Sequence, residues 1–330
     1  MPKRRLEDTL ADLRRLKAGP IDADAIRELR RVLAHEICFA VVRAAEVVAA
    51  REIVDLGDDL AAAFPRFLQG LPKSDPGCGA KLAIARALRT IGHPDATTLL
   101  AGVRHVQMEP AFGGSPAGGP YHADTAAELR AECVLGLAEL RHPDVLLHIA
   151  DLLADPEPTA RAGAARAVAV RGLRESLALL RLRVRVGDDD PRVLGECLDA
   201  MFALDAAGSL PFASDLLDRG GDAAEAAALA LGSSRLAAAL PTLRAWLERS
   251  PGALRTGLTA IATLRREEAF SYLIELVASG DRRHAVEALK ALAPQRADEA
   301  LAGRVRAAVV ERGDPKLRDA FEEGFRLSTF

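Results

Sequence analysis

Three basic residues lie at equivalent positions of successive helical segments and could form an anion-binding surface. Lys81, Arg130 and Arg161 each follow, by six residues, an aspartate at which we expect a helix to begin. Side chains at equivalent positions of stacked repeats line up, because each repeat contacts only its neighbours. The three cations therefore predict a groove for an acidic peptide in the N-terminal half of the chain. The equivalent residues further along carry no positive charge: Glu196, Ala228, Thr256 and Glu287.

A second candidate is the segment at residues 109–121, which holds four Gly and three Pro residues. Loops longer than about 12–15 residues are uncommon in compact arrays and are usually functional or disordered. We expect the segment either to fold over the binding face or to be a disordered surface loop. In the first case, Phe112 and Tyr121 would contact the partner.

The side chains that could bind a metal ion flank this segment. They are His105, Glu109, His122 and Asp124. Histidine and carboxylate groups ligate metals, but a flexible loop separates the two pairs, so we predict no metal site. The sequence has one His-Glu pair, at His35, and contains neither a His-Glu-x-x-His nor a Gly-x-Ser-x-Gly motif. We therefore predict no catalytic residue and no cofactor.

The cysteines are too far apart in the sequence to predict a zinc site. They are Cys38, Cys78, Cys133 and Cys197. Isolated cysteines in a long chain fit a reducing compartment, where thiols pack as small apolar groups. Cys78 lies at an expected helix start, where the helix dipole would lower the thiol pKa, although a buried structural thiol is the favoured interpretation. The charged N-terminal segment predicts a cytoplasmic protein, and no apolar run reaches the roughly 18 residues of a membrane span.

Helices must position these candidates, because helix-start signals recur along the chain. Asp-Pro or Ser-Pro pairs begin at positions 75, 155, 190, 250 and 314, where the first residue can cap a helix and Pro suits its first turn. From Asp124 onward the signals are spaced by 28–35 residues, which predicts two helices per repeat. Apolar residues recur at helical spacing in both helices of the repeat. Residues 180–186 alternate as in a strand, but their place in the repeat favours a helix.

The repeat that begins at Asp155 reads Asp-Pro-Glu-Pro-Thr-Ala-Arg, followed by Ala-Ala-Arg-Ala-Val at residues 164–168. It resembles the HEAT-like repeat of the phycobilisome-lyase type, and the resemblance extends from about Ala123 to Ala293. The resemblance implies a right-handed, all-α solenoid of about nine helix pairs, with the second helix of each pair on the concave side. It also implies the alternative to a peptide groove, in which a basic side chain such as Arg161 caps carboxylates of the neighbouring repeat.

We expect a single solenoid over residues 1–330. It would comprise divergent N-terminal helices at 1–72, HEAT-like repeats at 73–294 and C-terminal capping helices at 295–330. The distance from Asp75 to Asp124 exceeds one repeat, and the insertion at 109–121 accounts for the excess.

The net charge of −3, from 44 basic and 47 acidic residues, excludes a uniformly basic nucleic-acid binder. It conceals two blocks: residues 161–185 hold seven Arg and one Glu, and residues 188–234 hold ten acidic and two basic residues. Such blocks either steer partners or pair across repeats. We expect a non-enzymatic scaffold that binds another protein or an acidic peptide on its concave face, with no membrane partner. The alternatives are a bilin-lyase-like accessory of chromophore attachment or chaperoning, which only the resemblance suggests, and a HEAT-like nucleic-acid binder.

Overall fold

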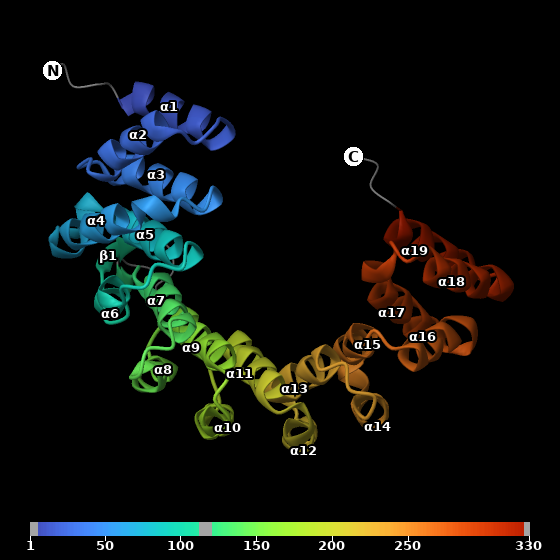
Figure 1. Ribbon diagram of the computed structural model, residues 1–330. Helices are drawn as coiled ribbons and strands as arrows, with labels where there is room; N and C mark the ends of the chain where they lie inside the picture. Colours follow the sequence, from blue (N-terminus) through green and yellow to red (C-terminus); the bar gives the residue numbers. More distant parts are fainter. Residues whose placement is uncertain (1–5, 112–120, 327–330) are drawn as a thin grey trace. The chain divides into compact units, whose positions relative to one another are not determined.

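The computed structural model describes residues 6–111 and 121–326, and these residues are almost entirely helical. They form nineteen α-helices, six short 3₁₀ helices and one two-stranded sheet (Figure 1). The all-α class predicted from the recurring helix signals is therefore confirmed. None of the described helices is long and apolar enough to cross a membrane.

By their contacts the helices form two compact units, residues 1–172 and residues 173–330. The first unit contains α1 (Leu6–Ala18), α2 (Ala23–Leu33), α3 (Cys38–Ala50), α4 (Gly57–Gln69), α5 (Gly79–Thr90), α6 (Thr97–Gly102), β1 (Met108–Ala111), β2 (Tyr121–Asp124), α7 (Ala127–Glu139), α8 (Val145–Leu153) and α9 (Pro158–Arg171). The second contains α10 (Leu177–Val186), α11 (Pro191–Leu204), α12 (Ala206–Leu217), α13 (Gly221–Ser233), α14 (Ala239–Arg249), α15 (Leu254–Thr263), α16 (Glu267–Ser279), α17 (Arg282–Leu292), α18 (Glu299–Arg312) and α19 (Pro315–Phe325).

Odd- and even-numbered helices play different parts within each unit. In the first unit, α1, α3, α5, α7 and α9 contact one another in succession, and so do α11, α13, α15, α17 and α19 in the second. Each even-numbered helix packs against the odd-numbered helix that follows it in the chain. The described helices therefore form nine such pairs, from α2–α3 to α18–α19, in addition to α1.

Small residues allow the odd-numbered helices to approach one another closely. A side chain added at Gly163 of α9 would clash with Ala131 of α7. One added at Gly232 of α13 would clash with the backbone of Ala260 in α15. The low aromatic content of 4% follows from this design, because thin layers of two helices leave no deep interior for large rings.

Aspartate caps begin helices at several of the predicted positions. Asp190 and Asp314 accept hydrogen bonds from the backbone N–H two residues further on, and Pro occupies the first position of α11 and α19. At Asp75 and Ser250 the prediction is displaced, because the chain first makes a 3₁₀ turn (Pro76–Cys78 and Pro251–Ala253) and α5 and α15 begin only at Gly79 and Leu254. The start predicted at Asp155 is also displaced, since α9 begins at Pro158. The signal thus correctly predicts that a helix follows, but the α-helix begins about one turn later where a 3₁₀ turn precedes it.

The two ends of the insertion at 109–121, with the residues next to them, form the only sheet among the described residues. β1 pairs antiparallel with β2, with Met108 opposite Asp124 and Ala111 opposite Tyr121. The sequence did not predict this hairpin, since Met-Glu-Pro-Ala shows no strand-like alternation of apolar residues. Residues 180–186 lie in α10, so the strand alternative considered for them is wrong. Residues 112–120, including Phe112, lie outside the described residues.

Candidate functional site

The structure places the three predicted cations in the first turns of α5, α7 and α9, but it buries them. Lys81, Arg130 and Arg161 are 0%, 2% and 5% exposed, respectively. This burial does not fit an exposed ladder of cations that awaits an acidic peptide. Each cation is instead bonded to oxygen atoms of the chain itself, both carboxylates and backbone carbonyls.

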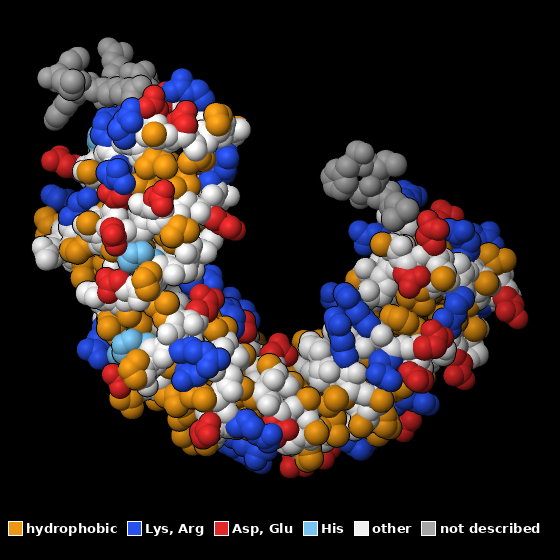
Figure 2. Space-filling model, viewed as in Figure 1, with side chains coloured by type: hydrophobic (Ala, Val, Ile, Leu, Met, Phe, Trp, Pro, Cys, Tyr) orange, Lys and Arg blue, Asp and Glu red, His pale blue; other side chains and the backbone are white. Residues whose placement is uncertain are grey.

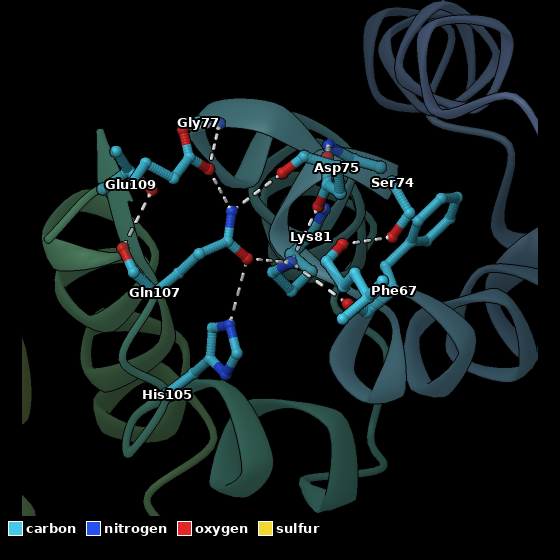
Figure 3. A network of polar contacts seen from close by, with 11 residues as sticks. Phe67, Ser74, Asp75, Gly77, Lys81, His105, Gln107 and Glu109 are labelled. Atoms are coloured by element: carbon cyan, nitrogen blue, oxygen red, sulfur yellow. Dashed lines mark hydrogen bonds and ion pairs between the residues drawn. The ribbon is translucent and has the colours of Figure 1, made fainter. Parts of the chain in front are cut away.

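Lys81 is held by groups from several segments of the first unit (Figure 3). Its Nζ lies 3.0 Å from Asp75 Oδ2 and donates hydrogen bonds to Gln107 Oε1 (2.8 Å) and to the Phe67 carbonyl (3.2 Å). The Asp75 carboxylate also accepts a hydrogen bond of 2.7 Å from the backbone N–H of Ala80, in the first turn of α5. The ammonium group therefore has three acceptors for its three protons, as a buried charge requires.

Gln107 and Glu109 fasten the hairpin to the start of α5 (Figure 3). The Gln107 amide donates to the Asp75 carbonyl (2.9 Å) and to the Glu109 carboxylate. The Glu109 carboxylate also accepts from the backbone N–H of Gly77, at 2.9 and 3.2 Å. Burial by itself would raise the pKa of Glu109, but the hydrogen bonds from Gln107 and Gly77 outweigh it and lower that pKa. The ionised carboxylate is thus the form that holds the hairpin.

Arg130 joins two carboxylates that lie far apart in the sequence. Its Nε and Nη2 each lie 2.8 Å from an oxygen of Asp155, and its Nη1 donates to Asp124 Oδ2 (2.7 Å) and to the His105 carbonyl (2.9 Å). Burial would raise the pKa of Asp124, but hydrogen bonds from the Gln107 backbone and from Arg130 outweigh it and lower that pKa. Arg130 therefore connects α7 both to β2 and to the loop before α9.

Arg161 completes this arrangement from the next helix. Its Nη1 donates to the carbonyls of Asp155 (2.9 Å) and Pro156 (2.8 Å). Asp155 is thus bonded through its carboxylate to Arg130 and through its carbonyl to Arg161. Lys81 and Arg130 therefore connect segments of different helix pairs, whereas these two bonds of Arg161 fix the segment that leads into its own helix.

The four side chains considered as metal ligands are not gathered around one point. Glu109 and Asp124 are engaged in the contacts given above, and His122 is exposed on β2. His105 Nε2 lies 3.5 Å from the Gln107 side-chain oxygen, and burial together with the nearby Lys81 charge lowers the pKa of His105. Within residues 6–111 and 121–326, no three His, Cys, Asp or Glu side chains could hold a metal ion together.

Cys78 precedes α5 and is buried. Burial raises the pKa of its thiol to about 11, against a smaller opposing effect of the Lys81 charge. The alternative of a thiol activated by the helix dipole is therefore wrong. The thiol stays protonated because the low-polarity surroundings disfavour a thiolate more strongly than the neighbouring cation favours it.

Two adjoining clefts on the first unit were not predicted from the sequence. The first has a volume of about 280 Å³ and is lined by Leu13, Arg14, Lys17, Phe39, Arg43, Glu46 and Val47, from α1 and α3. The second has a volume of about 610 Å³, lies between α3 and α5 and shares Glu46 with the first. A sequence signal for the first cleft exists, since Phe39 and Arg43 stand one turn apart in a helix made mostly of Ala and Val.

The first cleft combines an exposed aromatic ring with positive charge. Phe39 is 44% exposed, and the guanidinium carbon of Arg43 lies 5.1 Å from the centre of its ring. Arg43 forms an ion pair of 2.7 Å with Glu46. Arg14 and Lys17 form no ion pair with a carboxylate of the described part of the chain. The charged side chains that line the cleft therefore have a net positive charge.

The second cleft is lined mostly by small residues, and its arginines are paired with carboxylates. Ala49, Ala50 and Ala83 line it together with Gly79. Its two arginines are already paired with carboxylates of α7: Arg86 with Glu128, and Arg89 with Glu132 and Glu139. A ligand of this cleft would therefore be recognised by its shape rather than by its charge.

The basic and acidic blocks of the sequence are partly joined by ion pairs in the second unit. Arg183 donates to Asp188 (2.9 Å), and Arg174 pairs with Asp205. A cleft of about 360 Å³ between α11 and α13 is lined by carboxylates that include Asp199. Burial, and then the charge of Glu196, raises the pKa of Asp199. Figure 2 shows acidic, basic and apolar side chains interspersed on the visible face, with no extended area of one charge.

Comparisons with known proteins give no family for the chain. No family model matches it, and no curated protein matches it. It is similar to a solved crystal structure of an engineered protein, with 16% identity over 95% of this chain and 92% of that chain, and a TM-score of 0.35. This likeness assigns neither a fold family nor a function.

Proposed function

We propose that the chain is a HEAT-like α-solenoid that acts as a non-enzymatic scaffold for an acidic partner segment. The solenoid is supported by the nine helix pairs and by the succession of contacts along the odd-numbered helices of each unit. Repeats of this kind bury their apolar faces against their neighbours and leave a long surface for partners. Burial of the three predicted cations moves the binding site from Lys81, Arg130 and Arg161 to the two clefts of the first unit.

One observation carries the proposal: the exposed ring of Phe39 lies in a cleft with unpaired positive charge. An apolar or aromatic side chain of the partner would contact Phe39 and fill the cleft of about 280 Å³. A carboxylate next to it would meet Arg14 and Lys17, for which the described residues provide no ion pair. The preferred ligand is therefore a peptide with an apolar anchor residue next to Asp or Glu.

The second cleft would hold the continuation of the same peptide. Because carboxylates of α7 neutralise its arginines, the cleft would select for a peptide segment with small side chains rather than for a charged one. Charge recognition would thus be confined to one end of the bound segment. Tyr121, which is exposed on β2, stays a predicted contact of the insertion with the partner.

Affinity purification from the native cell, followed by mass spectrometry, tests this function. Reversing the charges of the cleft with Arg14→Glu and Lys17→Glu should remove the captured partner, and filling the second cleft with Ala83→Trp should weaken capture. Arg27→Glu on α2 is the control for charge reversal, because Arg27 is also exposed but is paired with Asp24 and lies outside both clefts. Retention of the same partners by the double variant would refute the assignment of the site.

A further inference from the structure

A second surface stands out in the other unit, on the exposed side of α10. Leu182 and Val186 are 62% and 70% exposed and lie one helical turn apart. Side chains at this spacing form a ridge on one face of a helix. Two large apolar side chains in such a row lie in contact with water, whereas α10 buries others, such as Leu180 and Val184.

Two arginines on the same exposed face are held in fixed positions. The guanidinium carbons of Arg181 and Arg185 lie 5.1 and 4.9 Å from the ring centre of Phe212, which belongs to α12. Arg181 also donates to the Gly208 carbonyl (3.2 Å). Stacking on a ring restricts a guanidinium without occupying the N–H groups at its edge, which suit carboxylates.

The charge of these two arginines is not used within the described residues. Arg183, on the opposite side of α10, is bonded to Asp188, and Arg174 is paired with Asp205. Neither Arg181 nor Arg185 forms an ion pair with a carboxylate of the described chain. The exposed face of α10 thus has an apolar ridge next to a pair of oriented, unneutralised cations.

We propose that this face docks an amphipathic helix of a partner protein, whose apolar side covers Leu182 and Val186 and whose carboxylates meet Arg181 and Arg185. An apolar ridge of one turn matches the groove of a second helix. Guanidinium groups that are already oriented bind carboxylates with little loss of freedom. This surface is separate from the clefts of the first unit and does not depend on the function proposed for them.

The distribution of charge favours a discrete helix over an anionic membrane or a nucleic acid. Residues 188–234, which follow α10 in the same unit, hold ten acidic and two basic residues. Part of this block is paired with arginines, but Asp199, Asp222 and Glu225 line the cleft between α11 and α13 and would repel an extended anionic surface. A helix with a few carboxylates needs to approach only the two arginines.

Binding of two synthetic helices to the full chain, measured by fluorescence anisotropy, tests the proposal. The first peptide is an amphipathic helix with a Leu ridge flanked by Glu, and the second has Lys in place of every Glu. The wild type should bind the Glu peptide at least about tenfold more tightly than the Lys peptide, as two charge-assisted pairs allow. The variant Arg181→Glu/Arg185→Glu should show the reverse preference, and Leu182→Ser/Val186→Ser should bind neither peptide.

A matched control separates this surface from any stacked arginine. Arg244 of α14 also lies over an aromatic ring, 4.4 Å from the centre of Tyr272, so Arg244→Glu should leave binding of the Glu peptide unchanged. Equal binding of the Glu peptide by wild type and by the charge-reversed variant, or no binding to either, would overturn the proposal. Sedimentation of the wild type but not of that variant with phosphatidylcholine–phosphatidylglycerol vesicles, without peptide binding, would overturn it in favour of a lipid surface.

Discussion

Replacement of Lys81 by methionine should destabilise the first unit strongly, because it removes one member of a fully buried ion pair. Methionine fills a similar space, so the loss is mainly electrostatic. Asp75, which is 1% exposed, would keep its backbone hydrogen bonds from Ala80 and residue 81 but lose its counter-charge. Gln107 Oε1 and the Phe67 carbonyl would each lose a donor. Unpairing a buried charge costs about 3–5 kcal/mol, and we expect the free energy of unfolding to fall by that amount.

The matched control is Lys73→Met, the same change at an exposed position of the same unit. It should alter the free energy of unfolding by less than about 0.5 kcal/mol. The double variant Asp75→Asn/Lys81→Met should be more stable than Lys81→Met alone, because no unpaired charge is left in the interior. Urea unfolding followed by circular dichroism measures all three variants. A loss for Lys81→Met below about 1 kcal/mol, or equal to that for Lys73→Met, would refute the reasoning.

Two further predictions concern helix approach and pH. Gly163→Ala should destabilise the protein by about 1–3 kcal/mol in thermal unfolding, because its Cβ would meet Ala131. Gly195→Ala in α11 meets open space and should stabilise by about 0.5–1 kcal/mol, so equal effects would contradict the close contact. Glu109→Gln should lower the hydrogen-exchange protection of the Gly77 amide. Because the folded pKa of Glu109 is lowered, its contribution is complete above the unfolded pKa of about 4.3 and disappears as the pH falls through the folded value. A difference in protection that persists at lower pH would contradict this.

The all-α class could be predicted from the sequence because the signals that begin a helix are local. Asp190 and Asp314 each contact the backbone two residues away, so the capping pattern is complete within a few letters of sequence. The hairpin could not be predicted, since Gln107 and Glu109 are tied to Asp75 and Gly77 across 32 residues. No local pattern reveals such a pairing.

The candidate site shows the same division between local and distant contacts. The equivalent positions of Lys81, Arg130 and Arg161 were evident in the sequence, but their burial was not, because their acceptors come from other segments. The cleft at Phe39 depends on the packing of α1 against α3, which the amphipathic pattern of either helix leaves undetermined. The surface of α10 was visible only as an alternation that also allowed a strand.

The contact between Lys81 and Gln107 has a consequence for the order in which the chain matures on the ribosome. The two residues are 26 positions apart, and the lysine is synthesised first. Until the amide emerges, the ammonium group lacks one of its acceptors and α5 cannot bury it without cost. Because domains generally fold from the N-terminus as they are made, α5 should dock late, in one step with the hairpin. A translational pause at the point where residue 107 has left the ribosomal exit tunnel would then give this part of the chain time to close before α7 emerges.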